Sequence, residues 1–177
     1  VYKELQSYTD SKAYLNDGKA KGNELAAKYV AAVEKFKPAY DKLGEVINAA
    51  NKEKNKKKME QMKKDGYKNY AAVMEATLRL TELVEKVQAT YTNPDKAAIE
   101  KEIGEIQGLL NGIDSKDSHK DSLVRNFNDT VGAIRQVMVD PNDKYLDRNL
   151  NRMIQQYNSY IDSYNRTKPD DLDGKKK

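Results

Sequence analysis

The stretch LAAKYVAAVEKFKPAYDKLGEVINAA, residues 25–50, decides the fold. Its apolar residues recur at alternating intervals of three and four: Leu25, Tyr29, Val33, Phe36, Tyr40, Leu43, Ile47 and Ala50. This spacing places them on one stripe of an α-helix, and such a stripe is expected to be buried against other helices. The rhythm returns over residues 99–113, 127–138 and 146–164. The sequence therefore predicts an all-α protein, an elongated antiparallel bundle of about five or six helices.

Turn and cap signals divide the chain into these helices. Asn16-Asp17-Gly18 ends a first helix, and Asp65-Gly66 closes a long lysine-rich hairpin tip between helices over 19–64 and 67–91. Thr92-Asn93-Pro94-Asp95 and Asp140-Pro141 combine a cap residue with proline, which starts the helices that follow. The further helices are expected over 94–111, 123–139 and 142–167, with a loop over 114–122. We expect one domain over 1–167 and a disordered charged tail over 168–177.

Composition excludes several classes of function. The 177 residues include no cysteine, which rules out disulfides, thiol catalysis and thiolate metal sites. No apolar run approaches the ~20 residues of a membrane span. The net charge of +4 is local, because eight lysines lie between Lys52 and Lys68 against three acidic residues.

This basic segment is the first candidate interaction surface. Its exposed lysines are expected to bind a partner or simply to keep a helix tip in water. An alternative is a polyanion such as a polysaccharide or nucleic acid, although no arginine or aromatic residue is interleaved to read bases, so nucleic acid is not favoured. The candidate residues are Lys54, Lys56, Lys57, Lys58, Lys63 and Lys64.

The last helix carries a repeat of seven residues. Leu150-Asn151, Tyr157-Asn158 and Tyr164-Asn165 stand seven apart. A strict heptad favours packing at a shallow angle, with core tyrosines and polar trim. The alternative is a ligand groove formed by Tyr157, Asn158, Tyr160, Tyr164 and Asn165.

Catalytic chemistry has little support in the sequence. His119 is the only histidine, and its neighbours Ser118 and Asp121 lie too close in sequence to converge as a triad. Asp114, Asp117 and Asp121 share a loop that lacks the glycine and bidentate glutamate of a calcium site. An enzyme would need carboxylates such as Asp41 and Glu45 to converge with others in a cleft. We expect no catalytic residue, cofactor or metal.

Two segments resemble a known family. They are Tyr14-Leu-Asn-Asp-Gly-Lys-Ala-Lys-Gly22, which Asn23-Glu-Leu25 follows, and Tyr157-Asn-Ser-Tyr-Ile-Asp-Ser-Tyr-Asn165. Together with the order of the helices, they resemble the YiiG-like bacterial lipoproteins, a family of unknown function. The resemblance implies export, with a lipid-bearing cysteine outside this chain and a helical domain facing the periplasm or cell surface.

These observations lead to one expectation about function. The chain is expected to be a non-enzymatic envelope lipoprotein domain with a structural role or an unknown protein partner. Its membrane attachment would be the lipid anchor outside this chain. Exposed heptad positions equally suit self-association, and the sequence leaves the oligomeric state open.

Overall fold

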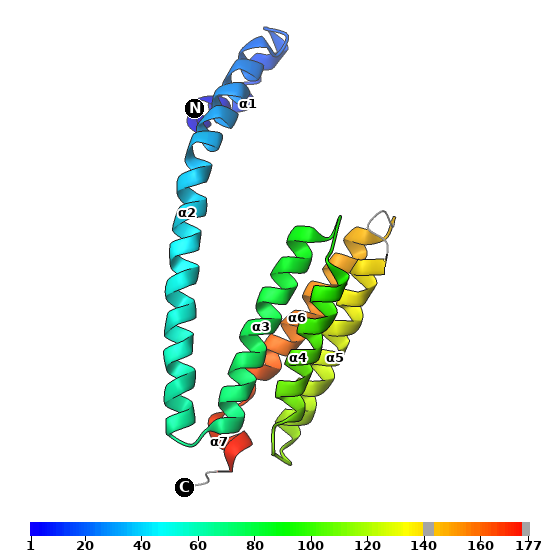
Figure 1. Cartoon of the computed structure of the whole chain (residues 1–177). Coiled ribbons are helices and arrows are strands. Elements are labelled where there is room, and N and C mark those ends of the chain that lie inside the picture. The colour runs from blue at the N-terminus through cyan, green and yellow to red at the C-terminus, as the bar shows by residue number, and fades with distance from the viewer. Residues whose placement is uncertain (140–143, 175–177) are drawn as a thin grey trace. The chain divides into compact units, whose positions relative to one another are not determined.

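The computed structural model describes residues 1–139 and 144–174, and all regular structure in these ranges is helical (Figure 1). Seven α-helices and one short 3-10 helix are present there, and no strand, so the predicted all-α class is confirmed. The chain divides into two compact units, Val1–Asn55 and Lys56–Lys177, where the sequence predicted one domain. No helix of the described ranges is long and apolar enough to cross a membrane.

The first unit contains α1 (Tyr2–Asp10), η1 (Ala13–Leu15) and most of α2 (Ala20–Lys64). The turn before α2 lies where the sequence predicted it. Gly18 and Lys19 both have positive φ there, 61° and 72°, which glycine adopts without strain.

A tyrosine from α1 holds this unit together. The Tyr8 hydroxyl donates to Asp17 Oδ1 at 2.6 Å, and the same carboxylate accepts from the Lys19 backbone amide at 2.9 Å. The hydrogen bond from Tyr8 lowers the pKa of Asp17. A Cβ atom on Gly22 would lie 2.6 Å from the Tyr8 ring, so glycine is what allows this ring to approach α2.

The second unit holds the main core. It contains the last turns of α2, then α3 (Lys68–Thr90), α4 (Lys96–Asn111), α5 (Ser118–Val139), α6 (Leu146–Arg166) and α7 (Pro169–Asp173). Helix α3 packs on α4 and α6, and α5 packs on α4 and α6. The predicted stripes over residues 99–113 and 127–138 are buried, namely Ile99, Ile103, Ile106, Leu110 and Ile113 with Phe127, Val131, Ile134 and Met138.

Arg79 joins α3 to α4 at the rim of this core. Its guanidinium donates to both carboxylate oxygens of Glu102, at 2.6 and 3.0 Å, and also binds Glu105. These two carboxylates raise the pKa of Arg79 further above its usual value. A bidentate pair of this kind fixes the relative position of two helices more firmly than a single ion pair does.

Some boundaries differ from the predictions. Helix α4 is capped by Asp95, whose side chain accepts from the Ala98 amide at 3.0 Å, and not by Asn93. Helix α5 begins at Ser118, inside the predicted loop, because Asp117 accepts from the His119 amide at 2.8 Å and caps it. The Asp140-Pro141 start signal lies outside the described residues.

The predicted disorder after residue 167 is wrong for 168–174. Pro169–Asp173 forms α7, and Leu172 is buried against the core. The Asp173 carboxylate accepts from the amides of Asn69 and Tyr70 at 2.9 and 3.0 Å. It thus caps the N-terminus of α3 from across the sequence, where a negative charge is favoured. Residues 175–177 lie outside the described ranges.

Candidate functional site

The apolar stripe of α2 is the main departure from the predicted packing. Leu25 is buried, but the rest of the stripe is exposed, at 43% for Tyr29, 45% for Val33, 64% for Phe36 and Tyr40, 56% for Leu43 and 50% for Ile47. The physical reason lies in the first unit itself, since α1 has only nine residues and reaches only the first turns of α2 through Tyr8. The expectation that this stripe is buried is therefore wrong within this unit.

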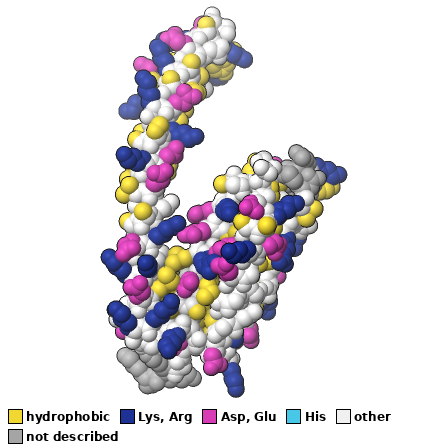
Figure 2. All heavy atoms as spheres, in the orientation of Figure 1, with side chains coloured by type: hydrophobic (Ala, Val, Ile, Leu, Met, Phe, Trp, Pro, Cys, Tyr) yellow, Lys and Arg dark blue, Asp and Glu magenta, His cyan; other side chains and the backbone are white. Residues whose placement is uncertain are grey.

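Charged residues accompany the stripe but do not cover it. Figure 2 shows hydrophobic side chains at intervals along α2, with basic and acidic side chains between them. Between residues 28 and 47 the chain carries four lysines and three acidic residues. The region is therefore close to neutral, and its dominant chemical character is a row of large apolar side chains in water. A row of several large exposed apolar side chains on one helix is typical of an interaction site.

The lysine-rich segment is helical and exposed, as predicted. Lys54, Lys56, Lys57, Lys58, Lys63 and Lys64 all lie in α2 and are all exposed. They do not form one basic face. Lys56 and Lys63 line a hollow of about 480 Å³ against α3, together with Met59, Leu78 and Arg79. Lys63 Nζ lies 3.7 Å from a Glu75 carboxylate oxygen.

The other lysines of the segment point elsewhere. Lys57 and Lys64 are seven residues apart and therefore share another side of the helix. The six predicted residues are thus divided between the side of α2 that faces α3 and other sides of this helix. Sequence reasoning did not separate them, although Met59, three residues after Lys56, gave a signal for the side that faces α3.

The tyrosines of α6 lie in the core and do not form a groove. Tyr160 is fully buried, Tyr157 and Tyr164 are half-buried, and all three belong to the core or pack on it. Asn158 and Asn165 are exposed. The structure therefore does not bring the five predicted groove residues together, and core packing is the arrangement that it shows.

Two threonines of α3 receive the hydroxyls of these tyrosines. Thr77 Oγ1 donates to the Val73 carbonyl at 2.8 Å, so it must accept from the Tyr160 hydroxyl, 3.1 Å away. Thr81 Oγ1 donates to the Thr77 carbonyl in the same way and accepts from Tyr157 at 2.8 Å. Sequence analysis missed both threonines, whose only signal is their spacing of four on an apolar helix.

Burial changes the acidity of these phenols. Desolvation raises the pKa of Tyr160 to about 12 and raises that of Tyr164 as well. The Tyr164 ring stacks on that of Tyr70 with centroids 6.2 Å apart. Neutral, hydrogen-bonded phenols in such positions hold helices together.

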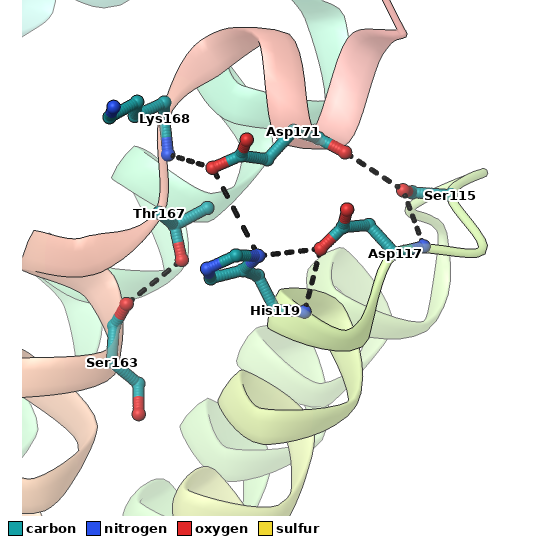
Figure 3. A network of polar contacts seen from close by, with 7 residues as sticks. All are labelled: Ser115, Asp117, His119, Ser163, Thr167, Lys168 and Asp171. Atoms are coloured by element: carbon teal, nitrogen blue, oxygen red, sulfur yellow. Dashed lines mark hydrogen bonds and ion pairs between the residues drawn. The ribbon is translucent and has the colours of Figure 1, made fainter.

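His119 belongs to a polar network at the end of the bundle where α5 begins (Figure 3). Its Nδ1 lies 2.6 Å from Asp117 Oδ1 and 4.0 Å from Asp171 Oδ2. Asp171 also accepts from the Lys168 amide at 2.7 Å. The network joins the loop before α5 to α7.

This network does not have the geometry of a catalytic triad. Ser115 Oγ accepts from the Asp117 amide at 3.2 Å and donates to the Asp171 carbonyl at 3.5 Å, so it faces the backbone and not the imidazole (Figure 3). Asp114 and Asp121 are exposed, and within the described residues no group of three acidic or histidine side chains is arranged to hold a metal ion. Asp41 and Glu45 are exposed on α2. The arrangement is that of a polar network that holds α5 and α7 together.

The first unit has a hollow of its own, between α1 and the start of α2. Its volume is about 730 Å³, and Lys3, Glu4, Lys21 and Glu24 are among the residues that line it. Lys28 and Glu24 form an ion pair at 2.5 Å on its wall. Mixed charge and exposure give this hollow no preference for one class of ligand.

Comparison with known proteins places the chain in a family. Residues 1–166 match the model of a family described as "Protein of unknown function (DUF3829)". The match covers α1 to α6 and therefore both units. Neither the curated proteins nor the solved structures give a match. The chain, with its exposed α2 stripe and its tyrosine-linked helical core, belongs to the DUF3829 family.

Proposed function

We propose that this chain is the interaction module of a bacterial cell-envelope lipoprotein and that it acts by binding, without catalysing a reaction. The observation that carries the proposal is the apolar face of α2, meaning Tyr29, Val33, Phe36, Tyr40, Leu43 and Ile47. Six large side chains at 43–64% exposure lie on one side of one helix. Apolar surface of this extent is costly to keep in water, and a binding partner removes that cost.

The geometry suits recognition of another helix. The six residues follow the 4-3-4-3-4 spacing of a coiled-coil seam, and they extend over roughly 27 Å of helix at 1.5 Å per residue. An apolar seam of this length offers a partner helix a continuous line of contact. Three of the six are aromatic, the residue class that contributes most to binding energy at interfaces.

The envelope location is supported by the resemblance to the YiiG-like lipoproteins in residues 14–25 and 157–165. In this proposal a lipid anchor outside the chain attaches the protein to the membrane. The helical units then face the periplasm or the cell surface, where α2 meets its partner.

The experiment is a crosslinking pulldown from the native envelope with three versions of the protein. They are the wild type, Phe36→Gln with Tyr40→Gln, and a control with Ala31→Gln and Glu45→Gln on the opposite side of α2. We expect a specific set of crosslinked proteins that the control keeps and the apolar-face variant loses. An identical set from all three versions would refute the apolar face as the binding surface.

Polyanion binding through the basic segment is the second candidate. The observation that favours it is the exposure of Lys54, Lys58 and Lys64. Affinity for heparin would then fall steeply as salt rises, because bound counterions are released on binding. A variant with all six lysines of the segment changed to glutamine should lose that affinity. Salt-independent binding, or binding that survives the substitutions, would exclude this candidate.

A further inference from the structure

From the same surface we infer that the apolar face of α2 pairs with the apolar face of α2 in a second copy of this chain, with the two helices parallel. The inference rests on the proposed function, because it names the occupant of that binding face. Three features of the described residues carry it, namely the distribution of exposed apolar residues, the area of the seam and the order of charges beside it.

The second copy offers a surface that the rest of the chain does not. Large exposed hydrophobic residues are concentrated in the first unit, where α2 alone contributes eight: Tyr29, Val30, Val33, Phe36, Tyr40, Leu43, Val46 and Ile47. The described part of the second unit contributes only Val139 and Tyr145, which belong to no stripe. Within the described residues, a seam that matches the apolar face of α2 in length and spacing is therefore found only on the α2 helix of a second copy.

The area is sufficient for a stable pair. The six side chains of the apolar face and the flanking Val30 and Val46 are each about half exposed and offer roughly 80–100 Å² apiece, or roughly 700 Å² per copy. Two copies would bury about 1,400 Å², which lies within the range of about 1,200–2,000 Å² for specific interfaces. In a parallel pair Tyr29, Phe36 and Leu43 form one set of layers, and each side chain meets its own counterpart.

The charges beside the seam favour the parallel direction. Glu34 and Asp41 lie on one flank of the stripe, and Lys28, Lys35 and Lys42 lie on the other, each set at intervals of seven. Two parallel helices place the acidic flank of one beside the basic flank of the other on both sides of the seam. Antiparallel helices would place like flanks together.

The position of one lysine also favours parallel over antiparallel pairing. Lys37 lies next to the seam on the acidic flank. In the parallel pair it faces Ala32 of the second copy, whereas the antiparallel register would place it opposite its own counterpart near the two-fold axis. The near-neutral balance of charge along the stripe also favours a protein over an anionic membrane surface.

The first test is the mass of the full chain in solution. We expect sedimentation equilibrium to give twice the 20.2 kDa of one chain. The dissociation constant of the dimer should rise about tenfold or more in the double variant Phe36→Gln with Tyr40→Gln. The control with Ala31→Gln and Glu45→Gln should remain paired. Circular dichroism checks that all versions keep their helices. A chain that is monomeric at every concentration, or that associates only with phosphatidylglycerol vesicles, would overturn the inference.

The second test fixes the direction, and the absence of cysteine from the chain makes it clean. In the parallel pair Leu43→Cys alone should form a disulfide-linked dimer under mild oxidation, while Glu45→Cys on the opposite face should not. A disulfide that forms only when Val33→Cys and Leu43→Cys proteins are mixed would show antiparallel helices and overturn the inference. If the chain is monomeric but the apolar-face variant still loses its envelope partners, self-association fails and the proposed function stands.

Discussion

The hydrogen bond between Tyr160 and Thr77 gives the sharpest test of how the second unit is held together. Tyr160 is fully buried and Thr77 is 6% exposed. Since the Thr77 hydrogen goes to the Val73 carbonyl, the Tyr160 hydroxyl is the donor in the pair. Replacing one partner at a time should therefore give unequal costs.

The magnitudes follow from what each substitution leaves behind. Thr77→Val keeps the shape but leaves the buried Tyr160 hydroxyl without an acceptor, which should cost about 1–3 kcal/mol of unfolding free energy. Tyr160→Phe removes the donor, but Thr77 still donates to the Val73 carbonyl, so the cost should be about 0.5–1.5 kcal/mol. The double variant removes both polar groups and should lose less than the sum of the two, with a coupling of about 1 kcal/mol or more.

The neighbouring pair provides a matched control. Thr81 and Tyr157 form the same kind of bond at 2.8 Å but are only half-buried, so water can replace the missing partner. Thr81→Val should therefore cost less than Thr77→Val. Urea unfolding followed by circular dichroism measures the wild type and all four variants. Additive single costs at the Thr77 pair, or an equal cost at the two pairs, would refute the reasoning.

Three further predictions concern pH, glycine and the last helix. Burial raises the pKa of Tyr160 to about 12, so the stability that its protonated phenol contributes is complete below pH 10 and is lost as pH rises from 10 toward 12. Thermal melts should show the deficit of Tyr160→Phe relative to wild type shrinking over that range, and a constant deficit would contradict this. Gly22→Ala should destabilise the first unit by about 1–3 kcal/mol because the new Cβ meets the Tyr8 ring at 2.6 Å, whereas Gly104→Ala, with nothing within 4 Å, should stabilise α4 by up to about 1 kcal/mol. Equal effects at the two glycines in hydrogen exchange would be inconsistent with that contact. Leu172→Ala should lower the free energy of unfolding by about 2–4 kcal/mol. It should also raise the rate of amide exchange at the start of α3, since Leu172 anchors the helix whose Asp173 caps α3. Unchanged exchange there would show that α7 does not stabilise the start of α3.

The sequence predicts the second unit well because its signals are repeated and local. Ile99 to Ile113 and Phe127 to Met138 keep a regular spacing, and each stripe has another stripe of similar length to cover it. Under these conditions periodicity is enough to identify the core. The choice between packing and a groove for the α6 tyrosines was not available from sequence, because it depends on Thr77 and Thr81 more than 70 residues away.

Helix α7 escaped prediction for a related reason. Residues 168–174 contain one apolar side chain and three aspartates, a composition typical of disorder. The segment is nevertheless ordered by Leu172 in the core and by Asp173 on the amides of Asn69 and Tyr70, contacts that span 103 and 104 residues. No local pattern reports a contact at that separation.

The α2 stripe shows the opposite failure, in which a strong local signal does not identify its partner. Spacing alone requires that Tyr29 to Ile47 share a face, and α2 bears this out. It does not say which element covers that face, and in the first unit none does. Substitutions on this face should therefore change binding with little effect on the core of the second unit, whereas substitutions at Thr77 or Leu172 should do the reverse. This separation lets the binding proposal be tested with proteins that remain folded, and a large loss of stability in Phe36→Gln would show that the face belongs to the core after all.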